Sequence, residues 1–176
     1  MAADYVLSES DITRTIKRMA HEIIEGTPEA SHLVLLGIPT RGAVLAERLA
    51  EQIQAITGSS IPVGVLDVTM YRDDIGHGEL RIPTPTTEPE GGIDDKVVVL
   101  VDDVLFSGRT VRAALDALID LGRPRTVRLA VLVDRGHRDF PIRADFVGKN
   151  LPSATHEHVS VFLEESDGEE GVRVER

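Results

Sequence analysis

The chain has 176 residues, of which 41% are apolar and only 3% aromatic, so its core must be mostly aliphatic. Cysteine is absent, which excludes disulfides and Cys-ligated zinc, and a formal net charge of −11 argues against nonspecific nucleic-acid binding. The sequence has no apolar run of membrane-spanning length and no signal-peptide pattern at its N-terminus, so we expect a cytoplasmic protein without membrane contact.

Helix-like and strand-like segments alternate along the chain. Residues 11–25 place apolar side chains at helical spacing, with Ser10 or Asp11 as the expected cap and Gly26 as the end. Further helices are expected at 43–56 and 110–121, and strands at 32–37, 61–72, 96–101, 126–134 and 158–165, with VRVER near the end pairing with the last strand. Residues 135–155 are expected to be irregular. Strand–helix alternation with continuous apolar strands predicts an α/β fold with a mainly parallel central sheet, covered by helices on both faces.

Charge is distributed unevenly along the sequence. Residues 157–176 hold seven acids against two arginines, whereas residues 123–149 hold seven bases against three acids. The overall negative charge therefore conceals a local basic region.

The stretch VVVLVDDVLFSGRT at 97–110 joins a buried strand to two carboxylates and a small-residue loop before a helix. In that loop Ser107, Gly108 and Thr110 offer backbone and hydroxyl donors at a helix N-terminus, which suits a phosphate monoester, although an ordinary helix cap is an equally good explanation of this loop taken alone. Asp102 and Asp103 repel each other unless they accept hydrogen bonds from paired hydroxyls or help to hold a divalent cation. Two alternatives for the acids are a solvated strand end and the acidic metal pocket of response-regulator receivers.

A second loop, GIPTRG at 37–42, also follows an expected strand. It lacks the Lys-Ser/Thr ending of a Walker P-loop, but its backbone N–H groups, Thr40 and the guanidinium of Arg41 could bind an oxyanion. A plain strand–helix turn is the alternative. Residues 73–92 form a long Gly- and Pro-containing segment of the kind that closes over ligands.

With both loops considered, the chain resembles the type I phosphoribosyltransferases. The segment 97–110 is similar to their phosphoribosyl pyrophosphate (PRPP) motif, and GIPTRG is similar to their pyrophosphate loop. Within that superfamily, LDVTMYRDD, RMAHEIIE and the segment 118–150 resemble the PyrR family, which are bifunctional pyrimidine-operon regulators and uracil phosphoribosyltransferases. The resemblance covers about residues 10–165. It implies one type I phosphoribosyltransferase domain over 1–176, with a small hood at about 133–157 and a mobile loop at about 70–92.

The resemblance also implies roles for individual residues. Asp102, Asp103, Arg41 and Arg72 would be catalytic, with Asp102 and Asp103 near Mg²⁺, mostly through water, and no organic cofactor. The predicted PRPP- and nucleotide-binding residues are Thr40, Arg41, Asp102, Asp103, Val104, Leu105, Phe106, Ser107, Gly108, Arg109 and Thr110. The predicted base-binding residues are Phe106, Val133, Asp134 and Arg135.

Phe106 narrows the choice of base. Purine-specific members of the superfamily carry an acidic residue at this place, just before the Ser/Thr-Gly pair, whereas this chain has an aromatic side chain that cannot accept a proton. A pyrimidine is therefore favoured. The implied reaction converts uracil and PRPP to UMP and pyrophosphate, and the protein mainly positions the reactants and stabilises the leaving group.

The resemblance further implies control of pyrimidine-operon expression through leader mRNA, acting on transcription termination or on translation, in a manner dependent on UMP or UTP. The predicted RNA-binding residues are Lys17, Arg18, His21, Arg138, Arg143 and Lys149, which could grip phosphates or stack on unpaired bases. A solvated helix face is the alternative for these cations. A dimer or larger homo-oligomer is also implied. Two other functions stay open: a salvage phosphoribosyltransferase without RNA regulation, and a nucleotide-sensing RNA-binding regulator with negligible catalysis.

Overall fold

The computed structural model describes residues 4–73 and 82–176. The part of the expected mobile loop at residues 74–81 lies outside the described residues. The elements are, in chain order, α1 (Glu9–Gly26), η1 (Ala30–His32), β1 (Leu33–Gly37), α2 (Arg41–Thr57), β2 (Val63–Val65), η2 (Thr69–Tyr71), β3 (Val97–Leu105), α3 (Arg109–Leu121), β4 (Thr126–Asp134), β5 (Phe146–Asn150), β6 (His158–Phe162), α4 (Glu164–Asp167) and β7 (Gly171–Glu175).

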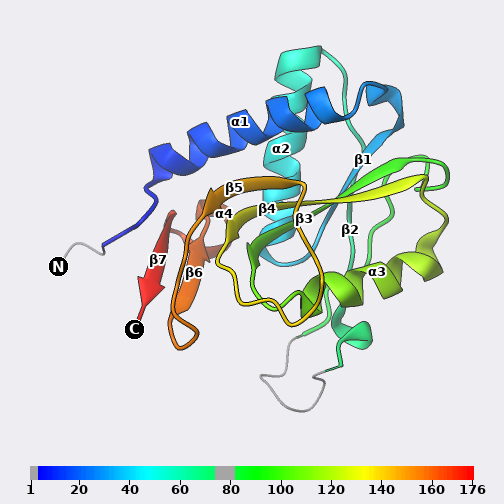
Figure 1. The fold of residues 1–176 in the computed structure, drawn as a ribbon. Helices are drawn as coiled ribbons and strands as arrows, with labels where there is room; N and C mark the ends of the chain where they lie inside the picture. The colour runs from blue at the N-terminus through cyan, green and yellow to red at the C-terminus, as the bar shows by residue number, and fades with distance from the viewer. Residues whose placement is uncertain (1–3, 74–81) are drawn as a thin grey trace.

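The central sheet has five parallel strands in the order β2-β1-β3-β4-β5, which confirms the predicted α/β architecture (Figure 1). β3 lies in the middle of the sheet. The predicted C-terminal pairing is also confirmed, because β6 and β7 form a separate antiparallel pair. Since every strand of the central sheet is parallel, all five carboxyl ends lie on one edge.

The sheet is buried on both faces by helices. Along β3, Val99 and Val101 pack in the cluster that contains α1 and α2, whereas Val98 and Leu100 pack in the cluster that contains α3. This alternation follows from the two-residue period of a strand, and it explains why β3 reads as a continuous apolar run.

The first helix begins earlier than predicted. α1 starts at Glu9 and its cap is Ser8, not Ser10 or Asp11. The Ser8 hydroxyl accepts a hydrogen bond from the Asp11 backbone N–H, and the Asp11 carboxylate accepts one from the Ser8 backbone N–H. This reciprocal capping box accounts for the Ser-x-x-Asp spacing at 8–11.

The second predicted strand, 61–72, is too long. β2 covers Val63–Val65 only, and its edge is met by Thr87, whose backbone exchanges hydrogen bonds of 2.9 Å with Val65 in both directions. Beyond it, the Asp67 carboxylate accepts hydrogen bonds from the backbone N–H and hydroxyl of Thr69. Such a local side-chain turn competes with extended structure, so the chain enters η2 instead.

Two further strand boundaries differ from the prediction. β3 continues four residues past the expected end at 101, so Asp102 and Asp103 lie inside the strand rather than after it. The segment expected to be irregular contains β5, which pairs with β4 from Phe146 to Asn150. β5 has no alternating apolar pattern, because Gly148 and the polar Lys149 and Asn150 occupy most of it.

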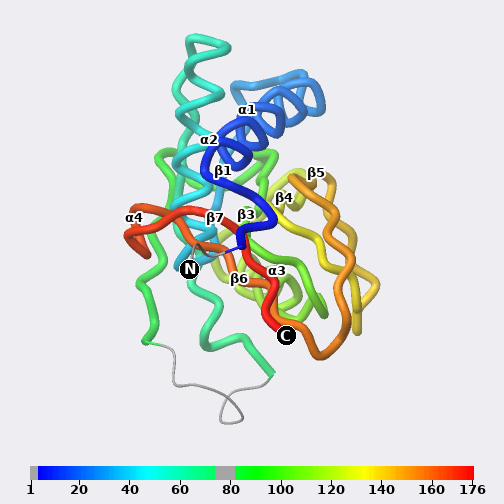
Figure 2. Tube along the Cα trace, turned by 90° about the vertical axis from the view of Figure 1, so that its left-hand side faces the viewer, coloured from blue at the N-terminus to red at the C-terminus, as the bar shows by residue number. Residues whose placement is uncertain are grey.

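The termini meet on the same side of the molecule. The Val6 N–H donates to the Val172 carbonyl at 2.7 Å, and the Val172 N–H donates to the Leu7 carbonyl at 2.9 Å. The N-terminal segment therefore runs beside β7 (Figure 2). Within residues 4–73 and 82–176, no helix combines the length and the apolar character needed to cross a membrane.

Close packing of α2 on β3 requires a glycine at position 42. A Cβ atom there would lie 2.4 Å from the Val101 carbonyl oxygen and 3.2 Å from the Asp102 Cα. The first turn of α2 thus rests directly on the backbone of β3 beside the acidic pair, and this contact brings the loop after β1 next to the end of β3.

We expect Gly42→Ala to lower the free energy of unfolding by about 3 kcal/mol, since the added methyl meets rigid backbone and not a flexible side chain. Urea unfolding followed by circular dichroism measures the change. Glu47→Ala, at an exposed position on the same helix, is the control and should change stability by less than about 0.5 kcal/mol. Equal stability of Gly42→Ala and the wild type would contradict the close packing.

Candidate functional site

The two predicted loops meet at the carboxyl edge of the sheet. Residues 38–40 follow β1, residues 106–108 follow β3, and the segment 135–145 follows β4. The Ile38 N–H donates to the Val101 carbonyl at 2.9 Å, which ties the first loop to the strand that carries the second. In open parallel sheets, ligands bind at this edge.

The acidic pair lies near the carboxyl end of β3, where the strand still pairs with β4. Asp102 is 8% exposed and Asp103 is half-buried. Oδ1 of Asp102 accepts a 2.8 Å hydrogen bond from the Asp103 N–H, and Oδ1 of Asp103 accepts a 2.8 Å hydrogen bond from the Val104 N–H. Each carboxylate is therefore oriented by the backbone that follows it.

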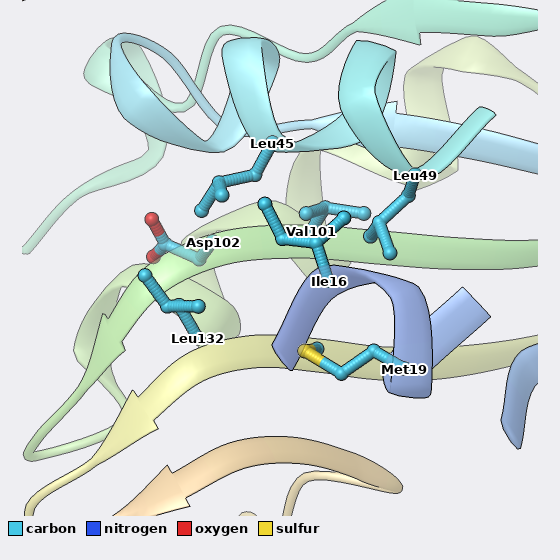
Figure 3. A pocket seen from close by; sticks show the side chains of 7 residues that line it. All are labelled: Ile16, Met19, Leu45, Leu49, Val101, Asp102 and Leu132. Carbon is cyan, nitrogen blue, oxygen red and sulfur yellow. The ribbon is translucent and has the colours of Figure 1, made fainter. Parts of the chain in front are cut away.

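At these two residues the side chains of β3 change the face of the sheet to which they point. Val101 and Val104 pack in the same apolar cluster, although residues three apart in a regular strand face opposite sides. The alternation of side chains between the two faces of the sheet is therefore interrupted at Asp102 and Asp103. Asp102 borders an apolar cavity lined by Ile16, Met19, Leu45, Leu49, Val101 and Leu132, with its carboxylate at one end of it (Figure 3).

The loop after β3 is held through its carbonyl groups. The Leu105 carbonyl accepts from the Arg135 N–H at 3.1 Å, and the Phe106 carbonyl accepts from Nη1 of Arg138 at 2.8 Å. The Ser107 carbonyl accepts from the N–H groups of Asp139 and Phe140, at 2.9 and 3.2 Å. Three successive carbonyls thus face the segment after β4.

This bonding sets the direction of the N–H groups in the same loop. In a planar trans peptide the N–H points opposite to the carbonyl, so the N–H groups of Phe106, Ser107 and Gly108 point away from the segment after β4. Gly108 has φ 93° and caps α3, whose first N–H groups have no partner inside the helix. The arrangement presents backbone donors to an anion at a helix N-terminus.

Phe106 lies between charged and aromatic neighbours. Its ring is 38% exposed, the Arg135 guanidinium carbon lies 4.2 Å from the ring centroid, and the His137 ring meets it edge-on at 6.1 Å. Arg135 is itself buried and donates to the Ser153 hydroxyl and the Ala154 carbonyl, both at 2.9 Å. The Arg135 guanidinium, which these hydrogen bonds hold in place, therefore covers one face of the Phe106 ring.

The predicted base-binding residues next to it are engaged within the protein. Val133 is fully buried in the core, so only its backbone is available to a ligand. Asp134 accepts from the Gly136 N–H at 3.0 Å and from Nη2 of Arg138 at 2.6 Å.

Arg138, which stays a predicted RNA-binding residue, joins the loops of the site. Besides Asp134 and the Phe106 carbonyl, it contacts the carbonyls of Ile142 and Gly136, at 2.9 and 3.4 Å. A guanidinium with this many internal partners crosslinks the segment after β4 to the loop after β3. Nothing in the residue pattern distinguished this arginine from the exposed Arg143.

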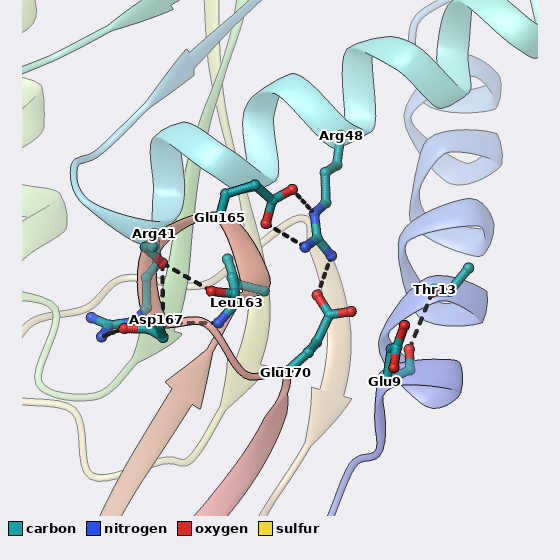
Figure 4. Close-up of polar contacts among 9 residues, drawn as sticks. Glu9, Thr13, Arg41, Arg48, Leu163, Glu165, Asp167 and Glu170 are labelled. Carbon is teal, nitrogen blue, oxygen red and sulfur yellow. Dashed lines mark hydrogen bonds and ion pairs between the residues drawn. The ribbon is translucent and has the colours of Figure 1, made fainter.

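The pyrophosphate-loop candidates lie at the start of α2. The Pro39–Thr40 peptide bond is cis, Thr40 precedes the first helical residue, and Arg41 opens the helix. Arg41 donates to both oxygens of Asp167, from Nε at 3.1 Å and from Nη2 at 2.7 Å (Figure 4). Asp167 was not among the predicted site residues, and it lies 126 residues away along the chain.

Arg72 reaches the phosphate loop from η2. Its Nη1 donates to the Thr110 hydroxyl at 3.2 Å. Beside it, Asp73 bridges Arg109 and Arg112, at 2.8 and 3.6 Å. The start of the expected mobile loop is therefore bound to the N-terminus of α3.

Four of the other predicted RNA-binding residues lie beside or on the edge strand β5. Lys17, Arg18 and His21 are exposed on α1, and Arg18 donates to the carbonyls of Val147 and Gly148. A Cβ at Gly148 would meet Thr15 of α1, so strand alternation places Lys149 on the opposite face of β5. The cations thus lie on both sides of one edge strand and do not form a single patch.

The donor set suits a weakly held divalent cation. Two adjacent carboxylates are present, but within the described parts of the chain no cluster of three or more His, Cys, Asp or Glu side chains could hold a metal alone. Mg²⁺ is commonly bound through one or two carboxylates together with water and substrate phosphates. Asp102 and Asp103 fit that mode.

A family model and several known proteins match nearly the whole length of this chain. A family model described as a phosphoribosyl transferase domain matches residues 3–166. The chain is 60% identical to the bifunctional protein PyrR of Leifsonia xyli, with 99% of this chain and 98% of that protein covered. It is 55% identical to the bifunctional protein PyrR of Mycobacterium tuberculosis, with 97% and 92% covered.

Among solved structures, a hypoxanthine phosphoribosyltransferase of Trypanosoma cruzi matches with a TM-score of 0.75 and 18% identity, covering 98% of this chain and 94% of that one. A hypoxanthine phosphoribosyltransferase of Staphylococcus aureus matches with a TM-score of 0.68 and 21% identity, covering 96% and 89%. At these identities the likeness concerns the fold.

We expect Arg138→Ala to lower the free energy of unfolding by about 2–3 kcal/mol, because it removes several hydrogen bonds and leaves the half-buried Asp134 without its charged partner. Amide exchange of residues 106–108 and 135–142 should also accelerate. Arg143→Ala, at an exposed position of the same segment, should change stability by less than about 0.5 kcal/mol. If both variants were equally stable, Arg138 would not crosslink these loops.

Proposed function

Because this chain belongs to the phosphoribosyl transferase family, and within it to the bifunctional PyrR proteins, we propose that it has two activities. It transfers the ribosyl 5-phosphate group of PRPP to N1 of uracil, giving UMP and pyrophosphate. It also regulates pyrimidine nucleotide biosynthesis genes by binding their leader mRNA in response to uridine nucleotides.

The observation that carries the transferase proposal is the adjacency of two different anion loops and one pair of carboxylates. α2 rests on β3 at Asp102, and only three residues separate the end of the same strand from the start of α3. A ligand with a phosphate at one end, a diol in the middle and a diphosphate at the other end matches this order.

Each part of the site has a defined task in this reaction. Backbone donors of 106–110 and the hydroxyls of Ser107 and Thr110 bind the 5-phosphate. Asp102 and Asp103 accept hydrogen bonds from the ribose hydroxyls, and Thr40 and Arg41 bind the pyrophosphate group. Uracil N1 forms a bond to C1 of the ribose as the bond to pyrophosphate breaks, and the N1 proton is released. The protein's contribution is positioning and stabilisation of the leaving group.

Mg²⁺ with PRPP would be held near Asp102 and Asp103 and would neutralise negative charge on the leaving pyrophosphate. Arg72, already at Thr110, would close over the bound PRPP from the side of η2.

The surroundings of Phe106 support a pyrimidine as the acceptor. Its ring and the buried Arg135 form a fixed stack beside the phosphate loop, and an aromatic side chain supplies no proton acceptor for a purine N7. Backbone groups of the predicted hood, with Val133, Asp134 and Arg135, would then hold the base.

For RNA, the exposed edge of β5 is the proposed contact. Lys17, Arg18 and His21 lie on one side of this strand and Lys149 on the other, so a single strand crossing the edge could meet cations on both sides. Arg143 is exposed nearby in the chain, whereas Arg138 would act indirectly by holding the loops. Both activities would place the protein in the cytoplasm, as a dimer or larger homo-oligomer.

The double variant Asp102→Asn with Asp103→Asn tests the transferase. It keeps the size of both side chains but removes the charges that accept the ribose hydroxyls, so kcat/KM for UMP formation should fall by about 10³-fold or more. Formation of UMP from PRPP and uracil is followed by chromatography.

The chain offers a matched control at the other end of β3. Asp94→Asn with Asp95→Asn makes the same change in an adjacent acidic pair that contacts Arg123 and Arg125, and should leave turnover unchanged. Wild-type turnover by the 102/103 variant would refute the assignment. Orotate, guanine and hypoxanthine as alternative bases distinguish a uracil enzyme from another salvage transferase.

The regulatory proposal is tested by gel-shift titration of a pyrimidine-operon leader transcript. Affinity should rise with UMP or UTP, and Lys17→Gln with Lys149→Gln should weaken binding and reduce the slope of log K against log salt by about 2. Lys96→Gln, at the amino end of the central strand β3, should have no effect.

Equal affinity for an unrelated hairpin of the same length would argue against leader recognition. Nucleotide-dependent RNA binding without measurable UMP formation would favour a regulator with negligible catalysis. UMP formation without RNA binding would favour a salvage enzyme.

A further inference from the structure

The acidic C-terminal segment is joined to α2 by a row of ion pairs. Arg41 pairs with Asp167, and seven residues later on the same helix Arg48 pairs with both Glu165 and Glu170 (Figure 4). The acidic side chains come from α4 and its flanks, between β6 and β7. This segment therefore contacts the helix that begins at the proposed pyrophosphate loop.

The Arg41–Asp167 pair has a geometry that fixes the guanidinium plane. Both carboxylate oxygens are used, against Nε and Nη2 of the arginine, and such side-on pairing determines orientation as well as distance. Asp167 is only 15% exposed, whereas Arg41 is 35% exposed. Oδ2 of Asp167 also accepts from the Leu163 N–H at 2.8 Å and from the Ser166 hydroxyl at 3.0 Å.

These contacts keep the carboxylate ionised. Burial acts to raise the pKa of Asp167, but the hydrogen bonds from Arg41, the Leu163 N–H and Ser166 outweigh it, so the pKa lies below its usual value. At neutral pH the carboxylate is charged and the pair is intact.

The pairing leaves one edge of Arg41 available. Side-on contact with Asp167 uses Nε and one hydrogen of Nη2, and the described residues supply no hydrogen-bond partner for Nη1. Nη1 and the second hydrogen of Nη2 form the end-on edge of the fork, which can accept a second oxyanion. Arg41 thus combines a fixed orientation with an open donor edge.

We propose that Asp167 is a positioning residue, which holds the Arg41 guanidinium so that its open edge binds the pyrophosphate end of PRPP. The proposal rests on the function proposed above. A long arginine side chain loses rotamer freedom when it binds an anion, and Asp167 imposes that restriction before the ligand arrives. The effect therefore falls on ligand affinity more than on turnover.

The test is Asp167→Asn, which keeps the shape of the side chain and removes its charge and one acceptor. Relative to the wild type, KM for PRPP should rise about three- to tenfold, with kcat changed less than twofold. The dissociation constant of Mg²⁺-pyrophosphate, measured by calorimetry without uracil, should rise by the same factor. Asp167→Glu, which retains the charge, should restore part of the loss.

Glu165→Gln is the matched control. It removes a carboxylate that pairs through both oxygens with Arg48, between the same segment and the same helix, but it does not touch Arg41. It should leave both constants at the wild-type value. Equal losses in the two variants would mean that the segment acts only by general packing, and tighter binding by Asp167→Asn would mean that Asp167 competes for Arg41; either result overturns the proposal.

Direct binding separates this proposal from the transferase assignment. If the wild type binds Mg²⁺-pyrophosphate but forms no UMP, the proposed function fails while the positioning role is decided by the same titrations. If the wild type does not bind pyrophosphate, the positioning role is refuted.

Discussion

Three consecutive carbonyl groups at the end of β3 hold the candidate site together. Because those of Leu105, Phe106 and Ser107 accept hydrogen bonds from the segment after β4, the N–H groups of this loop face the other way. The same bonds place Phe106 against Arg135. The phosphate loop and the proposed base-binding region are thus two sides of one hydrogen-bonded unit, and neither can shift without the other.

The parts of the fold that were predictable from the sequence are those in which each side chain reports its own environment. The run at Val97–Val101 is buried on both faces, so it consists only of aliphatic residues, and α3 has a regular apolar stripe. The anion loops were recognisable because small and hydroxyl residues directly follow such strands. The parallel character of the central sheet was predicted from the same apolar strands, and the pairing of β6 with β7 was also predicted.

Other features depend on contacts between distant residues and left no local pattern. β5 pairs through backbone groups at the sheet edge, where Lys149 and Asn150 face solvent, so its composition resembles a loop. Arg138 is bound by carbonyl groups and by the Asp134 carboxylate, whereas Arg143 is exposed, and the sequence around them does not show this difference. Asp167 belongs to a stretch that the sequence distinguishes only by its negative charge, whereas three of its acids bind arginines of α2.

The N-terminal segment and α2 both contact residues that are synthesised much later. Leu7 pairs with Val172, and Arg41 contacts Asp167, more than a hundred residues downstream. The five strands of the central sheet end at Asn150, so all of them are synthesised before Asp167, the carboxylate that Arg41 contacts. If Asp167 positions Arg41 as proposed, a chain in which this segment has not yet docked on α2 would bind pyrophosphate more weakly.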